Sequence, residues 1–233
     1  MLTLLTFPDH FGQPGSSPFV VKSICLLNMS GQPWQRKLAD VRKMPKQKLP
    51  VLKVGERLIP DSENIRSYLE EQGAEFDPGL SDSDLAASRA FIRMAEEHLY
   101  FHQVADRWLR DDVWAVTRDV IFEAIPKPIR GIISGKIRKK LQAGLYTQGI
   151  ARFTEAERAE RAAKDLNAIK LQLGDKPYLF GNSPTAADAS ICPMLSGLVS
   201  IPLPTEVSNL VKNDAILTDY IARMRDALYH IPQ

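Results

Sequence analysis

The sequence predicts an α/β domain followed by an all-helical domain. Within residues 1–73, short strand-like runs alternate with segments that have helical apolar spacing. Residues 74–83 show neither pattern and carry the loop-forming dipeptide Pro78-Gly79, which is typical of a linker. From residue 84 to residue 233 nearly all apolar spacing is helical. Because the chain has 233 residues, each domain is long enough to bury a core of its own.

The first domain is expected to begin with a strand, a helix and a second strand. Residues 2–7 form a short run typical of a strand, and residues 18–30 carry apolar side chains at helical spacing. Gly31 follows that helix, where a C-terminal glycine commonly stands. Residues 34–41 have the pattern of a second, more polar strand. We therefore expect a β-α-β unit here.

Residues 48–65, KLPVLKVGERLIPDSENI, supply the rest of the first domain. Pro50 stands at a strand start, one of the few strand positions that tolerates a missing N–H. Gly55 marks the turn of a tight hairpin, and Asp61 and Ser62 can cap the helix that follows. Two strands and a helix after a β-α-β unit give the element order of the thioredoxin fold.

The second domain is expected to contain five or six helices. Apolar residues recur at helical spacing, and prolines, glycines or capping residues separate the runs. The expected helices cover residues 85–124, 129–145, 154–174, a segment that starts at residue 185, and residues 215–229.

Capping boxes open two of these helices. Thr154 and Glu157 have the usual residue types, whereas Thr185 is followed at the third position by Asp188. We assign the Thr185 to Asp188 segment a role in folding and none in catalysis.

Composition and charge narrow the class of function. A net charge of +2 argues against a general nucleic-acid binder. The chain has no signal-peptide pattern and no run of the roughly 20 apolar residues that cross a bilayer. Cys25 and Cys192 lie far apart in apolar runs, which indicates two buried reduced thiols. We expect a cytoplasmic protein with no nucleic-acid partner and no membrane insertion.

Several motifs resemble the glutathione S-transferase superfamily over essentially the whole chain. RMAEEHLYF at residues 93–101 and GIARFTEAE at residues 149–157 resemble the branch that contains the metaxins and the failed-axon-connections proteins. The resemblance implies a thioredoxin-like N-terminal domain, a helical C-terminal domain and glutathione as co-substrate. The superfamily motifs are SPF with a lysine at residues 17–22, KLPVL at residues 48–52, DSENIRSYL at residues 61–69 and KPYLFGNSPTAADASI at residues 176–191.

The resemblance also implies where glutathione would bind. In the family the proline of KLPVL is cis, so Pro50 would turn the main chain of Leu49 toward the cysteinyl part of glutathione. Asp61 would meet the γ-glutamyl ammonium, while Ser62 and the helix N-terminus would meet its carboxylate. Lys48 would face the glycine carboxylate. A plain strand start and a plain helix cap are the alternatives for these residues.

Ser17 is the candidate for activating the thiol. It stands at the N-cap of the first helix, with Pro18 at the first helical position. A hydroxyl there can donate to a sulfur anion, and together with the helix N-terminus it lowers a thiol pKa. Glutaredoxin-like and omega-type family members carry cysteine here, so serine disfavours mixed-disulfide chemistry. Ser16 is the alternative if the register shifts by one residue, and a structural cap is another.

The remaining candidates concern the second substrate and metals. The resemblance places the electrophile beside the first long helix of the second domain, so Phe11, Tyr100 and Trp108 are candidates for its pocket. His98 and His102 are spaced i,i+4, but the residue after His98 is not the glutamate that the zincin motif needs. We therefore expect no metal site.

The sequence thus predicts an enzyme in which glutathione, activated at Ser17, attacks a small apolar electrophile. The resemblance also implies a homodimer. The alternative is a non-catalytic binding or interaction protein of the same fold, which the resemblance to metaxins favours. A third interpretation, disulfide reduction, would depend on Cys25 instead of Ser17.

Overall fold

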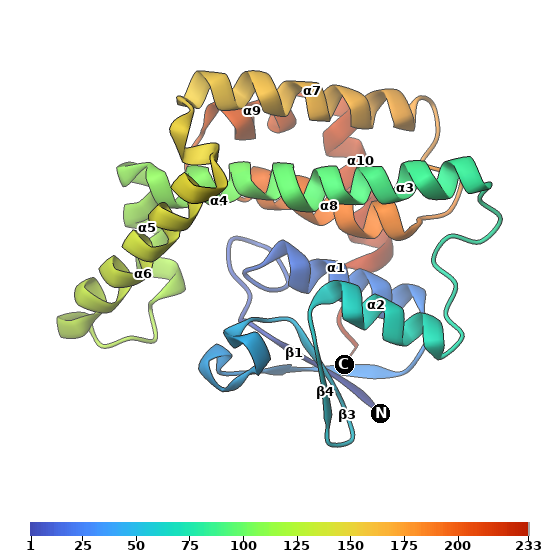
Figure 1. Cartoon of the computed structure of the whole chain (residues 1–233), viewed down its shortest axis with the longest axis horizontal. Helices are drawn as coiled ribbons and strands as arrows, with labels where there is room; N and C mark the ends of the chain where they lie inside the picture. Colours follow the sequence, from blue (N-terminus) through green and yellow to red (C-terminus); the bar gives the residue numbers. More distant parts are fainter. Residues whose placement is uncertain (233) are drawn as a thin grey trace.

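The computed structural model describes residues 1–232, and a four-stranded mixed sheet forms the basis of its N-terminal domain (Figure 1). The elements of this domain are β1 (Leu2–Thr6), α1 (Pro18–Met29), β2 (Trp34–Leu38), β3 (Val51–Val54), β4 (Arg57–Pro60) and α2 (Ser62–Glu71). The strand order is β2-β1-β3-β4, with β1 parallel to β2 and antiparallel to β3, and β3 antiparallel to β4. The predicted thioredoxin-like order is confirmed.

The two faces of the sheet are covered differently. Successive side chains of β1 point to opposite faces, so Leu4 joins the main core with α1, while Leu5 packs with Val51 on the other face. Partly buried Val41 and Met44, from the connection between β2 and β3, cover that second face. The helices α1 and α2 therefore lie on the side of the sheet that faces the rest of the molecule (Figure 1).

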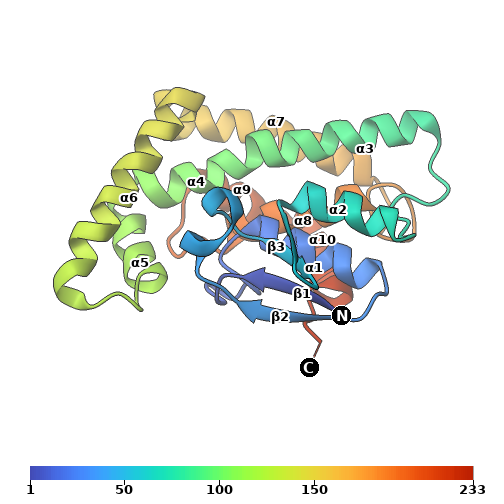
Figure 2. The same ribbon diagram turned by 60° about the horizontal axis from the view of Figure 1, so that its bottom comes forward.

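The C-terminal domain is helical, and a π-helical segment, Ala95–Leu99, joins its first two helices. Helix α8 lies at its centre, where it is buried from residue 186 to residue 198. Helices α5 and α6 project from one end of the molecule (Figure 2). No helix within residues 1–232 offers an apolar stretch that would cross a bilayer. The helices are α3 (Asp82–Met94), α4 (Tyr100–Leu109), α5 (Asp111–Ile121), α6 (Lys127–Gln148), α7 (Glu155–Leu173), α8 (Ala186–Val199), α9 (Glu206–Lys212) and α10 (Ala215–Leu228).

The expected single helix over residues 85–124 is wrong, because α4 ends at Leu109 and a separate helix, α5, begins at Asp111. Arg110 is extended, with φ −74° and ψ 129°. The carboxylate of Asp112 accepts from the N–H of Val113, and Arg110 pairs with both Asp112 and Glu155. Carboxylates at the start of a helix are favourable, so these contacts stabilise a new helix start at α5.

Helix α9 is absent from the sequence prediction. Thr205 and Ser208 cap it reciprocally, since each side chain accepts from the other residue's N–H. Serine at the third position is a weaker signal than the glutamate of a standard capping box. The helix is also only two turns long, so periodicity does not reveal it.

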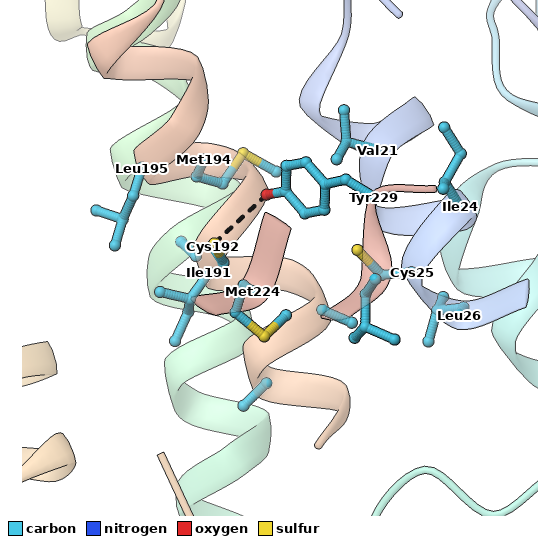
Figure 3. Close-up of a cluster of buried hydrophobic side chains, with 14 of the residues drawn as sticks. Val21, Ile24, Cys25, Leu26, Ile191, Cys192, Met194, Leu195, Met224 and Tyr229 are labelled. Carbon is cyan, nitrogen blue, oxygen red and sulfur yellow. Dashed lines mark hydrogen bonds between the residues drawn. The ribbon is translucent and has the colours of Figure 1, made fainter. Parts of the chain in front are cut away.

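The two domains share one hydrophobic core where α1 packs against α8 and α10 (Figure 3). Cys25 on α1 and Cys192 on α8 both lie fully buried in it. The hydroxyl of Tyr229 donates to the sulfur of Cys192 at 3.4 Å. Burial raises the pKa of both thiols, Cys192 to about 12. A buried thiol with a raised pKa is a poor nucleophile, so nothing here favours disulfide reduction through Cys25.

Candidate functional site

A cleft of about 470 Å³ opens between the N-terminal domain and the start of the helical domain. It is bounded by the N-terminus of α1, the segment before β3, the N-terminus of α2 and the π-helical segment. Seven predicted site residues, from four separate segments of the sequence, therefore meet around one cleft. They are Ser17, Lys48, Leu49, Pro50, Asp61, Ser62 and Tyr100.

The peptide bond between Leu49 and Pro50 is cis, and it lies immediately before the first residue of β3, Val51. Leu49 is buried in the small core on the outer face of the sheet. The carbonyl of Pro50 accepts from the N–H of Asp61 at 3.2 Å. That bond ties the start of β3 to the start of α2, so the two segments expected to hold a peptide lie side by side.

Asp61 begins α2 in an unusual backbone conformation, with φ +82° and ψ 136°. For a residue with a Cβ this conformation costs about 1–3 kcal/mol, and such residues cluster at functional sites. Its carboxylate accepts from the N–H of Glu63 at 3.0 Å. Asp61 is exposed to the cleft, whereas Ser62 is buried beneath it. The helix N-terminus and the Asp61 carboxylate together present both signs of charge to a ligand.

Ser17 occupies the N-cap of α1, with Pro18 at the first helical position. Its carbonyl accepts from Val20 and Val21, but its hydroxyl makes no capping bond. The hydroxyl of Ser16, in contrast, donates to the carbonyl of Pro8 and is also hydrogen-bonded to Nδ1 of His10. Of the two serines, Ser17 therefore has the hydroxyl that is available at the cleft.

Replacing Gly15 with alanine is expected to lower the free energy of unfolding by about 1–3 kcal/mol. Gly15 precedes the two serines at φ +118°, and an added Cβ would lie 2.7 Å from Cγ1 of Val20. Urea unfolding measures the loss. The matched control is Gly12→Ala, at φ +70° with no atom within 4 Å of the added Cβ, and it should lose less. Equal losses would contradict the steric overlap as the cause.

Opposite charges line different parts of the cleft. Glu63 and Glu96 come from α2 and the π-helical segment, while Lys46 and Lys48 come from the segment before β3. Burial opposes ionisation of Glu63, but Lys22 and Arg89 outweigh it and lower its pKa to about 2. Both glutamates are paired with cations of the protein, Glu63 with Lys22 and Arg89 and Glu96 with Lys22 and Arg93. Asp61 has no ion-pair partner among the described residues, so its carboxylate is the one that can meet an ammonium group of a ligand, and the two lysines can meet carboxylates.

Aromatic side chains form the apolar part of the cleft, and they correct part of the sequence-based list. Tyr100 and Phe19 meet edge to face at 4.8 Å, and both line the cleft. Within residues 1–232, Phe11 and Trp108 are not among the lining residues. Eight residues along α4 rotate Trp108 about 80° away from Tyr100. It packs instead against Trp114 at 5.0 Å, and Phe11 stacks beneath a guanidinium.

Sequence reasoning missed the charged residues that the helical domain brings to the cleft. Arg93, Glu96 and Glu97 line it, and Arg93 pairs with both glutamates. The signal was present, because these residues immediately precede Tyr100 in the motif RMAEEHLYF. Which face of the helix would meet the N-terminal domain cannot be read from that motif, since a π-helical turn changes the phase of the helix.

His98 and His102, the two histidines spaced i,i+4, lie in different environments. Nδ1 of His98 bonds the carboxylate of Asp165 at 2.5 Å. His102 is buried, and burial lowers its pKa to about 3, so it is neutral. Within residues 1–232 no three ligand-type side chains are grouped in a way that would hold a metal ion.

Comparison with known families matches both parts of the chain. Residues 18–113 match the family model described as the glutathione S-transferase N-terminal domain. Residues 162–224 match the model of the glutathione S-transferase C-terminal domain.

Individual relatives extend these matches. The isoprene-epoxide–glutathione S-transferase of Rhodococcus sp. (strain AD45) is 30% identical over 233 residues, covering 97% of this chain and 98% of the relative. The metaxin-2 homolog of Caenorhabditis elegans is 26% identical over 154 residues, covering 66% of this chain and 67% of the relative. A glutathione S-transferase of Ceriporiopsis subvermispora, solved in complex with glutathione, has a TM-score of 0.67 at 17% identity, covering 100% of this chain and 99% of that one. The last likeness concerns the fold alone.

Proposed function

The chain belongs to the glutathione S-transferase family, and from this premise we propose that it catalyses attack of glutathione on a small apolar electrophile. The observation that supports the proposal most strongly is the free hydroxyl of Ser17 at the N-terminus of α1, on the same cleft as the cis peptide of Pro50. A thiol held there would receive an O–H donor and the positive end of a helix.

Each part of glutathione has a counterpart in the cleft. The main chain of Leu49 would dock the cysteinyl residue, and Asp61 with Ser62 would hold the γ-glutamyl group. Lys48 would face the glycine carboxylate. The thiol would lose its proton to water, and the thiolate, accepting from Ser17, would attack an electrophilic carbon lying against Tyr100. With an epoxide, the C–S bond would form as a ring C–O bond breaks, and the alkoxide would take a proton from water. The name of the Rhodococcus relative makes small epoxides the first electrophiles to test.

The Ser17→Ala variant is expected to lower kcat/KM for glutathione addition to a small aliphatic epoxide about 10- to 150-fold. A hydrogen bond to a charged group contributes about 1.5–3 kcal/mol, and this one would be made to the thiolate. Glutathione affinity, measured by calorimetry, should change little because the peptide contacts remain.

Two serine variants complete the test. Ser16→Ala addresses the alternative register, and Ser23→Ala, whose hydroxyl bonds the carbonyl of Phe19 within α1, controls for loss of a serine from the helix. Unchanged turnover in Ser17→Ala would remove Ser17 from the proposal. If the wild-type protein binds no glutathione, the enzymatic function itself is wrong.

A second candidate function is a non-catalytic binding protein of the same family. The metaxin-2 relative favours it, since that match covers two thirds of either chain. Glutathione binding without turnover of any small electrophile would support this candidate. The first proposal also includes that the protein is a homodimer and that it is cytoplasmic. Sedimentation equilibrium tests the oligomeric state of the protein.

A further inference from the structure

A second, very small cavity lies directly behind Ser17. Its volume is about 10 Å³, which is room for a single water molecule. Ser17 lines both this cavity and the cleft, so its hydroxyl stands between the two. The opposite wall is formed by Gln103 and Arg107 of α4, both more than nine-tenths buried.

Arg107 is a buried cation whose neighbours are neutral. Its guanidinium donates to Oγ of Ser200 at 2.9 Å, and the amide oxygen of Gln103 accepts from its two terminal nitrogens at 3.0 and 3.1 Å. The ring of Phe11 lies 5.3 Å away, and Nε has no partner. Among the described residues no carboxylate pairs with it.

A buried charge without a counter-ion is unusual, because burial costs it the hydration that a paired ion recovers. Burial lowers the pKa of Arg107 to about 10, so the group is still a cation at neutral pH. The other titratable groups beside it are His10 and Tyr100. His10 is hydrogen-bonded to Ser16, and burial raises the pKa of Tyr100, so neither supplies an anion.

The guanidinium of Arg107 lies on the side of α4 that faces Ser17, where the proposed function places the thiolate. Seven residues along α4 bring Arg107 to within about 20° of the face that carries Tyr100, which lines the cleft. Ser17 and the water-sized cavity then lie between the guanidinium and the cleft. An anion bound at Ser17 would supply the counter-ion that Arg107 lacks.

We propose that Arg107 is a positioning residue for thiol activation, stabilising the glutathione thiolate through Ser17 and the cavity without touching the sulfur. This inference rests on the proposed function. The thiol gives its proton to water and the sulfur keeps the electron pair. The field of the buried cation then favours the sulfur anion, and it is weakly screened because the Arg107 side chain is more than nine-tenths buried.

The test is Gln103→Glu, since removal of Arg107 itself risks the fold. A glutamate at this position places a carboxylate where the amide oxygen now accepts from the guanidinium, and it neutralises the cation without changing the packing volume. Ultraviolet absorption of the thiolate, followed against pH in the glutathione complex, should show the thiol pKa raised by about 1. Turnover by Gln103→Glu should be about tenfold lower than that of the wild-type protein at pH values below the wild-type thiol pKa. At pH values above the raised pKa of the variant, the two rates should converge.

The matched control is Gln103→Met, which has a similar size and leaves the cation without a counter-ion. Its thiol pKa should stay near the wild-type value. A Gln103→Glu variant that titrates like the wild-type protein would overturn the inference while leaving the proposed function intact. If the wild-type complex shows no ionised thiol at neutral pH, the proposed function fails first.

Discussion

Replacing Lys22 with methionine is expected to lower the free energy of unfolding by about 3–5 kcal/mol. Lys22 is fully buried on α1, and its ammonium lies 2.6 Å from Glu96 and 3.0 Å from Glu63. Glu96 is nearly as buried, so its carboxylate would lose its buried cationic partner and keep only Arg93, whose side chain is partly exposed. Methionine keeps most of the apolar stem, which isolates the loss of charge. Urea denaturation followed by circular dichroism measures the change.

A double variant separates the ion pair from packing. Lys22→Met with Glu96→Gln removes both charges, and it should be more stable than the sum of the two single losses predicts. Arg93 would still have Glu97 as a partner. Additive losses would contradict the interpretation that Lys22 and Glu96 form a coupled pair across the two domains.

The single variant Lys22→Met is also expected to change how the stability of the protein depends on pH in acid. The pKa of Glu63 is about 2 in the folded state, below its ordinary value of 4.5. A lowered carboxyl pKa stabilises the fold above pH 4.5, and that stabilisation is lost as the pH falls toward 2. Without Lys22 the pKa of Glu63 should rise, so stability should fall less steeply with pH in this range.

Lys22 illustrates what the sequence can and cannot predict. The helix over residues 18–30 was predicted from its apolar spacing, and the fold and family were confirmed. A lysine inside an apolar helix gives no indication of its partners, because Glu63 and Glu96 belong to other elements and Glu96 to another domain. Tertiary packing sets such contacts.

The candidate site shows the same division. The residues of α2 and β3 could be placed, since turn and capping chemistry is local and Asp61 and Ser62 are adjacent. Arg107 and Gln103 could not be placed, because their importance follows from what lies behind Ser17 in space. Trp108 was assigned to the pocket from the family resemblance, and in the structure it packs against Trp114 of α5 instead.

Replacing Asp188 with alanine is also expected to lower the free energy of unfolding by about 3–5 kcal/mol. Its carboxylate is buried and accepts from both the N–H and the hydroxyl of Thr185, from the N–H of Leu179 and from the hydroxyl of Tyr220, at 2.7 to 2.9 Å. Each buried donor left without an acceptor costs about 1–3 kcal/mol. Chemical denaturation at neutral pH measures the loss.

The control variant is Glu157→Ala, because Glu157 holds in the capping box of α7 the position that Asp188 holds in that of α8. Glu157 forms the capping box of α7 with Thr154, but that box is exposed, so water replaces the lost acceptor. Glu157→Ala should therefore lose much less stability than Asp188→Ala, although the two variants delete the same motif. Equal losses would mean that the capping geometry matters and burial does not. A larger loss at Asp188 would show that this aspartate joins α8, α10 and the segment before α8 into one unit, as its bonds to Tyr220 and Leu179 imply.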